Sequence, residues 1–396
     1  MSGATVVGAA VHTFGRFDDL DAAAMNKWAA RAALADADLG WKDVDAVVVG
    51  SSRFSGGLSR GLGATDVLES LGQSGVTAFN VTSACATGGS VFTLAHALVR
   101  SGAHETVLAV GGEKMPPGFI ARSPGSVEKA SDVDYVRWAC IGMSNPAYWA
   151  LECTRRMQDH GTSERQLAVV ASKAHELGVH NERARYRKPI SVDDVIASPY
   201  VAWPLRLFEV CAVSDGAAAV VITSEERAAR ADTAPIRVAA AQVATNRFGD
   251  PALTMPQVST VAVPGAEYVS ETTLAVQRAF ETSGLGPEDV DLIELTDNSV
   301  WQVLTYPELW GFCEPGEAES LVEAGETMPD GRLPINPSGG FLCFGEATVA
   351  MGLFQIAEIV TQLRGRSGAR QVPGARVGLA QTLGLGGYGT AVILST

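Results

Sequence analysis

The chain of 396 residues lacks any long apolar run and is poor in basic residues. No stretch reaches the roughly 18 apolar residues of a membrane span, so we expect no membrane segment. Lys and Arg number 30 against 44 Asp and Glu, which gives a formal net charge of −14. Because nucleic-acid binders usually present a basic surface, this balance argues against DNA or RNA as a partner. No basic group precedes the apolar N-terminal stretch, which argues against a secretory signal and favours a cytoplasmic protein.

Paired cysteine motifs are also missing. The six cysteines are scattered without a C-x-x-C, so the sequence suggests neither a zinc site nor a disulfide framework, and we expect no metal. They are Cys85, Cys140, Cys153, Cys211, Cys313 and Cys343. Hydrophobic residues make up 46% of the chain and charged residues 19%, which suits a large core. The length predicts two or three domains, or one large duplicated fold.

Two segments of the chain read alike. "DLGWKDVDAVVVG" (38–50) and "GLGPEDVDLIEL" (284–295) each place a helix end at a glycine, then an acidic turn, then "DVD" before a short apolar run. Such runs are typical of buried strands. More loosely, each half also places an Asn and a Gly/Ser-rich turn before a small-residue helix and another buried strand. We therefore predict a duplicated α/β fold with mostly parallel strand pairing, because strands alternate with helices.

The domain prediction follows from this repeat. We assign 1–250 to the N-terminal half and 251–396 to the C-terminal half. Residues 113–204 have little strand pattern and read as a loop domain inserted in the first half, with helices of its own. Long insertions in compact domains are usually functional.

Cys85 is the first candidate nucleophile. It stands in "NVTSACATGG" before a predicted helix, Ala86–Val99, where the helix dipole and free N–H groups would stabilise a thiolate. Gly88 and Gly89 would let a ligand or another backbone approach closely. From these residues alone, a working nucleophile and a buried structural thiol remain equally open.

Five segments, in order, resemble the thiolase family, especially its sterol-carrier-protein type. The segment around Cys85 resembles the family's nucleophile segment, and "VSDGAAAVV" is a specific marker of the type. "LTDNSVW" occupies the place of an H-D-C-F motif, "INPSGGFLCFGEA" that of N-x-x-G-G followed by G-H-P, and "GLGGYG" that of the glycine-rich C-terminal turn. The resemblance covers nearly the whole chain and includes the duplication.

This resemblance implies a five-layer αβαβα thiolase fold, with Cys85 and the C-terminal motifs meeting between the two halves. It implies that Cys85 takes an acyl group from an acyl-CoA as a thioester, with oxyanion holes stabilising the developing charge. Coenzyme A would then be substrate or product, and we expect no other cofactor. The family also implies a homodimer.

The sequence departs from the family at its catalytic motifs. Glu346 stands where G-H-P has its histidine, residues 296–299 lack the histidine and cysteine of H-D-C-F, and Gly384 replaces the cysteine of C-x-G. Glu346 is the predicted base if burial raises its pKa; it would otherwise orient backbone or bind a partner. Cys343 is a candidate acid/base thiol or a packing residue. Asn298 is a candidate hydrogen-bond donor to a thioester oxygen, next to Asp297, which would fix the loop.

Candidate substrate-binding residues lie in loops. The glycine-rich turns contribute Gly340, Gly384 and Gly386. Arg187 belongs to "RARYRK", the main basic cluster, which would meet the phosphates of coenzyme A or form a solvated face. His180 precedes it in a loop that resembles the family's "HN" element, although a lone loop histidine is more often structural.

Three functions remain open at this stage. The first is a thiolase-like acyltransferase that makes or breaks a carbon–carbon bond beside a CoA thioester, acting on a bulky or aromatic acyl-CoA such as benzoylsuccinyl-CoA. The second is a thiolase-fold retro-aldolase for steroid side-chain acyl-CoAs. These proteins share the G-E-A triplet but carry tyrosines at the positions of Thr296 and Thr348. The third is a non-catalytic scaffold. In the first or third case, a small OB-fold zinc-ribbon subunit is the expected partner.

Overall fold

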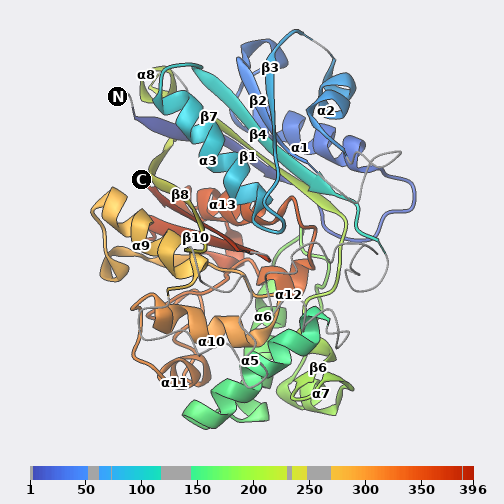
Figure 1. The fold of residues 1–396 in the computed structure, drawn as a ribbon, viewed down its shortest axis with the longest axis vertical. Helices are drawn as coiled ribbons and strands as arrows, with labels where there is room; N and C mark the ends of the chain where they lie inside the picture. Colours follow the sequence, from blue (N-terminus) through green and yellow to red (C-terminus); the bar gives the residue numbers. More distant parts are fainter. Residues whose placement is uncertain are drawn as a thin grey trace.

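The computed structural model describes residues 3–51, 62–72, 74–116, 144–229, 234–247, 269–385 and 387–396 (Figure 1). In these ranges the main sheet has nine strands in the order β3-β2-β4-β7-β1-β8-β11-β10-β9. The strands are β1 (Ala4–Val11), β2 (Ala46–Gly50), β3 (Thr77–Val81), β4 (Thr106–Glu113), β7 (Gly216–Ser224), β8 (Ile236–Thr245), β9 (Leu292–Glu294), β10 (Val377–Gly384) and β11 (Tyr388–Ser395). The main helices are α1 (Ala22–Asp36), α2 (Ala64–Leu71), α3 (Thr87–Arg100), α9 (Glu271–Ser283) and α13 (Met351–Leu363).

Strands β2 and β4 of the N-terminal half are buried on both faces, whereas β3 at the end of the sheet is partly exposed. In β2, Val47 and Val49 belong to a core with α1 and α2, whereas Val48 belongs to the central core with α3 and α13. Helices α3 and α13 each contact β4, β7 and β1 in one part of the sheet and β10 and β11 in the other part. Helix α9 covers β8 and β11. The layers are therefore helix, sheet, helix, sheet, helix, which confirms the predicted five-layer fold (Figure 1).

Helices α3 and α13 approach each other closely where they begin. A Cβ on Gly88 would lie 2.8 Å from the backbone nitrogen of Leu353, and a Cβ on Gly352 would overlap the backbone of Gly89. Only glycine permits this contact. The sequence predicted that Gly88 and Gly89 would let either a ligand or another backbone approach closely. These contacts show the close approach of another backbone.

The "DVD" repeat has the same structural role in both halves. The first aspartate caps a single 3₁₀ turn: Asp43 accepts from Gly40 N and Asp289 accepts from Gly286 N, both at 2.8 Å. The second aspartate accepts two backbone N–H groups at the start of a strand that neighbours its own in the sheet, β4 for Asp45 and β10 for Asp291.

The ends of the preceding helices differ between the halves. Helix α9 ends at the left-handed Gly284, as predicted. Helix α1 ends at Asp36 and the left-handed residue is Asp38, so the prediction that this helix ends at a glycine is wrong. Aspartate tolerates this conformation better than most residues because its short side chain hydrogen-bonds locally.

The prediction of mostly parallel pairing is wrong. Strand β2 pairs in parallel with β3 and β4, and β9 with β10, but the other pairs in the main sheet of the described ranges are antiparallel. The helix crossovers do give parallel neighbours, as expected. The additional strands β7, β1, β8 and β11 alternate in direction, so each is antiparallel to both of its neighbours, and β11 follows β10 directly as a hairpin.

The insertion contributes α5 (Asn145–His160), α6 (Glu164–Val179), α7 (Val192–Ala197) and β5 (Tyr200–Ala202), which forms a hairpin with β6 (Leu205–Arg206) just after the predicted end of the insertion. These elements gather at the lower end of Figure 1 beside α10 (Val300–Leu309) and α11 (Ala318–Glu323). Arg156 of α5 pairs with Glu308 and Glu319, which joins the insertion to the C-terminal half. The predicted boundary at residue 250 lies outside the described residues. Within the described ranges, no helix has the length and apolarity needed to cross a membrane.

Candidate active site

A tight turn between β3 and α3 presents Cys85. Ala84 has a φ of +51°, in the left-handed region, which costs about 1–3 kcal/mol for such a residue and is found mainly at functional sites. The hydroxyl of Thr87 supports the turn by accepting from Ser83 N at 2.8 Å and donating to the Ala84 carbonyl at 2.6 Å. The helix begins at Thr87, one residue later than predicted, and Cys85 is only partly buried just before it.

Glu346 is fixed beside this cysteine by its own backbone. Its N–H donates to the Ala212 carbonyl at 2.6 Å, and its carbonyl accepts from Ser214 N at 2.9 Å. Gly345 allows this approach, because a Cβ there would overlap the Ser214 hydroxyl. The Glu346 side chain is only 4% exposed.

The Glu346 carboxylate accepts hydrogen bonds from the Cys85 thiol and the Asn298 amide. Burial raises the pKa of Glu346 above its ordinary value, and these two hydrogen bonds oppose the shift. A buried carboxylate in contact with a thiol has the position and the basicity of a general base.

Asn298 connects this pair to a second thiol, Cys211. The Asn298 amide nitrogen donates to the Cys211 sulfur at 3.4 Å, and the Asn298 carbonyl accepts from Cys211 N at 2.8 Å. Next to it, the Asp297 carboxylate accepts from Phe341 N at 2.6 Å, and burial raises the pKa of Asp297 to about 8. The site therefore combines two cysteines of the N-terminal half with a carboxylate and an amide of the C-terminal half.

The structure places Cys343 in a different environment. It lies in the one-turn helix α12 (Gly340–Phe344), is fully buried, and donates to the Ala174 carbonyl of α6 at 3.1 Å. Burial raises the pKa of its thiol. These contacts match the packing interpretation that the sequence left open, and they direct the thiol to α6.

The predicted glycines support the site through backbone contacts. A Cβ at Gly384 would overlap the Ser83 carbonyl, so the end of β10 lies directly against the turn that carries Cys85. Gly340 has a φ of +65°, and a Cβ there would overlap the Asp297 carboxylate. Gly386 lies outside the described residues.

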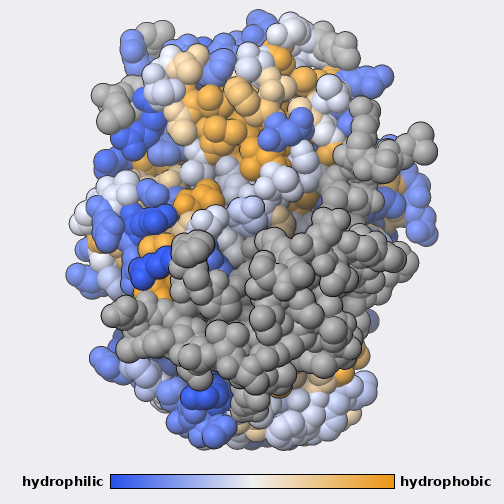
Figure 2. All heavy atoms as spheres, viewed as in Figure 1, coloured by the Kyte–Doolittle hydropathy of each residue, from blue (hydrophilic) through white to orange (hydrophobic). Residues whose placement is uncertain are grey.

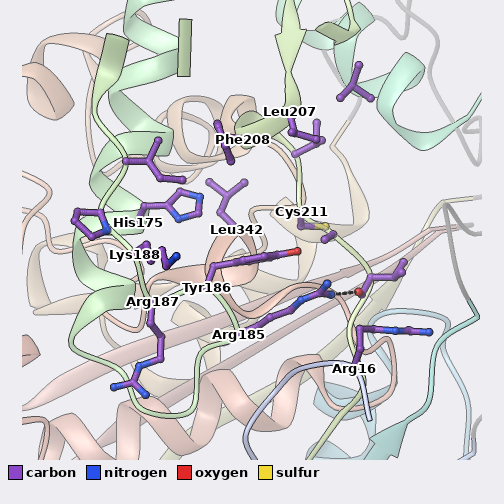
Figure 3. Close-up of a pocket in the computed structure, with 16 residues that line it drawn as sticks. Arg16, His175, Arg185, Tyr186, Arg187, Lys188, Leu207, Phe208, Cys211 and Leu342 are labelled. Atoms are coloured by element: carbon purple, nitrogen blue, oxygen red, sulfur yellow. Dashed lines mark hydrogen bonds between the residues drawn. The ribbon is translucent and has the colours of Figure 1, made fainter. Parts of the chain in front are cut away.

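A cavity of about 1080 Å³ opens beside Cys211 (Figure 3). Its apolar lining comes from the insertion, the segment that follows it and the α12 region: Ile190, Val201, Leu207, Phe208, Val210 and Leu342. Figure 3 shows Tyr186 and Arg185 extending across the cavity from the loop after α6 toward the side that carries Cys211. Its volume slightly exceeds the range of about 300–1,000 Å³ that is usual for ligand pockets.

Among the described residues, every charged side chain that lines this cavity is basic. These residues are Arg16, Arg185, Arg187 and Lys188. Arg185 is held by the Val213 carbonyl at 2.5 Å and the Ser214 hydroxyl at 3.2 Å. Arg16 pairs with Asp215 at 3.0 Å, which leaves Arg185, Arg187 and Lys188 as the cations that create a local positive potential favouring an anionic ligand.

Arg187 also borders a second cavity, of about 720 Å³, together with His180. His180 is exposed, and its neighbour Asn181 is the buried residue of the "HN" pair, donating to the Ser338 carbonyl at 3.0 Å. In the described ranges, no group of His, Cys, Asp or Glu side chains could hold a metal ion.

The family models match both halves of this chain. "Thiolase, N-terminal domain" matches residues 4–226 and "Thiolase C-terminal domain-like" matches residues 258–396. The chain belongs to the thiolase family. It is an acyltransferase of the thiolase type, which confirms the predicted family and enzyme class.

Curated relatives of this thiolase align over most of its length. It is 32% identical to the acetyl-CoA acetyltransferase of Methanothermobacter thermautotrophicus, covering 99% of each chain. It is 34% identical to rat sterol carrier protein 2 over 91% of its own length, and spans 65% of that longer protein. It is 31% identical to the benzoylsuccinyl-CoA thiolase subunit BbsB of Thauera aromatica, covering 81% of this thiolase and 80% of the relative.

Two solved structures share the fold. The Ltp2-ChsH2(DUF35) aldolase matches with a TM-score of 0.82 and 27% identity, covering 100% of this thiolase and 98% of that chain. Human mitochondrial 3-ketoacyl-CoA thiolase matches with a TM-score of 0.73 at 18% identity, covering 100% and 99%.

Sequence reasoning missed Cys211 as a site residue, whereas Arg185 and Tyr186 stand in the "RARYRK" run that it singled out without naming them. Cys211 stands three residues before Ser214 of the "VSDG" marker, and the loop there forms hydrogen bonds with Glu346. The position of that marker was the signal that could have identified it.

Proposed function

We propose that this thiolase transfers acyl groups through a thioester on Cys85, with Glu346 as the general base that replaces the family's histidine. The observation that carries this proposal is the hydrogen bond from the Cys85 thiol to the buried Glu346 carboxylate. A non-catalytic scaffold would have no need for a strained turn that presents a thiol to a buried carboxylate.

The reaction needs one proton to move twice. Glu346 takes the proton of Cys85 as the sulfur attacks the acyl carbonyl, and returns it when the acyl group leaves for coenzyme A or for a carbon nucleophile. A carboxylate whose pKa is raised toward neutrality can do both. Asn298 holds the carboxylate in place through its amide. These steps use only side chains of this chain and coenzyme A, and no other cofactor.

We propose that the 1080 Å³ cavity receives the acyl-CoA. Its cations, with Arg187 and Lys188 exposed at its edge, would pair with the phosphates of coenzyme A. The apolar wall with Phe208 and Leu342 would receive a bulky or aromatic acyl group. The likeness to subunit BbsB makes benzoylsuccinyl-CoA the first substrate to test.

A second copy of the chain is the proposed partner at β3. This strand forms one end of the sheet in the described ranges, so its outer edge has backbone groups free for pairing. Figure 2 shows apolar atoms gathered in the upper part of the molecule, where Figure 1 shows α3 and β4. Half-exposed apolar residues there are Phe79, Val81, Leu94 and Leu98. A dimer mass in light scattering would support this interface.

A further subunit is proposed from the structural comparison. The name of the Ltp2-ChsH2(DUF35) aldolase joins a protein similar to this thiolase with a second component. We propose that a small OB-fold zinc-ribbon subunit binds this chain in the same manner, in the cytoplasm. Co-purification from the native cell tests this pairing.

The retro-aldolase is the second candidate, because that aldolase is similar over the whole chain. An aldolase of this kind would cleave its substrate without an acyl-enzyme. Thr296 and Thr348, at the positions of the aldolase tyrosines, are buried and hydrogen-bonded: Thr296 accepts from Leu383 N at 2.9 Å and Thr348 donates to Glu113 at 3.1 Å.

Acyl labelling of Cys85 separates the two candidates. The purified protein is incubated with acetyl-CoA or benzoyl-CoA and then analysed by peptide mass spectrometry. We expect an acyl mass on the Cys85 peptide, its loss in Cys85→Ala, and its retention in Cys313→Ala, a half-buried cysteine used as the matched control. Cleavage of a 3-hydroxyacyl-CoA with no acyl mass on Cys85 would overturn the acyltransferase proposal.

A further inference from the structure

We propose that Cys211 is the second thiol of the active site, which gives a proton to, or removes one from, the carbon next to the thioester. This inference rests on the proposed function, because it concerns the carbon–carbon step of the same reaction.

The position of Cys211 is set by the loop that also fixes Glu346. Residues 211–214 run beside residues 345–346, with a parallel bridge between Val213 and Glu346. Asn298 contacts both the Cys211 sulfur and the Glu346 carboxylate, and that carboxylate in turn contacts Cys85. The two thiols are therefore joined by only two intervening side chains.

The Cys211 sulfur has its proton available for transfer. It is the acceptor in its 3.4 Å contact with Asn298, so this bond does not use the S–H proton, and the amide would stabilise a transient thiolate. The residue is 6% exposed and lines the 1080 Å³ cavity. A small exposed fraction that opens into a cavity is what a proton donor to a bound substrate requires.

A second observation indicates that this cavity receives a polar group. His175 lines it and is 4% exposed, yet its Nδ1 has no hydrogen-bond partner among the described residues. Burial lowers the pKa of His175 to about 4, so the ring is neutral. A buried polar atom without a partner is costly unless a ligand or water satisfies it.

The carbon–carbon step needs such a group. When the bond beside the thioester breaks, its electron pair stays on the α-carbon, which must take up a proton. Gly384 carries no side chain for this task, and Cys343 donates to Ala174. Cys211 lines the cavity and contacts Asn298, which in turn hydrogen-bonds to Glu346.

The proton balance closes with the two thiols and Glu346. Cys85 gives its proton to Glu346 and its sulfur bonds to the ketone carbon. The carbon–carbon bond breaks and the Cys211 proton moves to the α-carbon. The thiol of incoming coenzyme A then gives its proton to Cys211 as its sulfur takes the acyl group, and Glu346 returns its proton to Cys85.

Electrostatics couples these proton transfers in the required order. Burial, and after it the negative charge of Glu346, raise the pKa of the Cys211 thiol. Once Glu346 has taken the Cys85 proton, that negative charge is gone. Cys211 can then release its proton more easily, at the stage where the α-carbon needs it.

The test compares two partial reactions of the full-length protein. One is acyl transfer from acetyl-CoA to isotopically labelled coenzyme A, which needs no carbon proton. The other is deuterium exchange at the methyl carbon of acetyl-CoA in D₂O, which needs a carbon base. In Cys211→Ala we expect exchange to fall by about 10²–10⁴-fold and acyl transfer to fall far less, because in that partial reaction Glu346 gives its proton to the departing coenzyme A and can take the proton of the incoming one.

Two further variants keep the result decisive. Cys211→Ser preserves the shape of the side chain, and Cys313→Ala is the cysteine control. The role of Cys211 would be overturned if the Ser and Ala variants lost both partial reactions equally, or if exchange were unchanged in them. It would also be overturned if exchange were lost in Tyr186→Phe and not in the Cys211 variants. Absence of acyl transfer in the wild-type protein would instead contradict the proposed function.

Discussion

The two halves of this thiolase share a frame and differ in the loops that carry their chemistry. In the first half, Cys85 lies two residues before α3, on a tight turn after β3. In the second half, Glu346 lies five residues before α13, and the one-turn helix α12 comes before it. The helices themselves meet at small residues, so the frame holds the two loops together while each loop contributes a different reacting group.

The frame should be most sensitive where the halves touch. Gly352→Ala places a methyl group against the backbone of Gly89, which cannot move aside as a side chain can. We expect a loss of about 1–3 kcal/mol in the free energy of unfolding, measured by denaturant titration. Gly40→Ala is the matched control, because a Cβ there makes only ordinary side-chain contacts, with Asp43 at 3.5 Å and Lys42 at 3.9 Å. An equal effect of the two changes would break the comparison.

The repeated aspartates should contribute equally if the halves are equivalent. Asp45→Ala removes the acceptor of Glu105 N and Thr106 N, and Asp291→Ala that of Arg376 N and Val377 N. Each change should lower the free energy of unfolding by about 1–2 kcal/mol, because two backbone donors lose their partner. The Asn variants keep an oxygen acceptor and should lose less. Clearly unequal losses for the two Ala variants would show that the repeat has diverged in energy as well as in chemistry.

Much of the fold could be predicted from the sequence because its signals are local. The "DVD" segments determine a turn and a strand start within a few residues, and the same segment appears twice. Pairing direction could not be predicted in this way. It depends on pairs such as β1 with β7, β4 with β7 and β8 with β11, whose strands come from distant parts of the chain.

The candidate site shows the same contrast between residues that a local motif identifies and residues that only the folded chain brings together. Cys85, Asn298 and Glu346 stand in recognisable motifs, and the structure brings them together. Cys343 is three residues from Glu346 in sequence, but the turn of α12 directs its thiol to Ala174. Cys211 is 135 residues from Glu346 and was missed, because only the folded chain brings its loop beside residues 345–346.

The pH dependence of Cys85 reactivity tests the central claim, that Glu346 is its base, most directly. The rate of Cys85 acylation by acetyl-CoA is measured across acidic to mildly alkaline pH for wild type, Glu346→Gln and the exposed control Glu288→Gln. The deprotonated carboxylate is the base, so the wild-type rate should rise with pH, with its midpoint at the raised pKa of Glu346, above the ordinary 4.5. In Glu346→Gln this rise should vanish and the rate should fall by about 10²–10⁴-fold. The same profile and rate in wild type and Glu346→Gln would contradict the account.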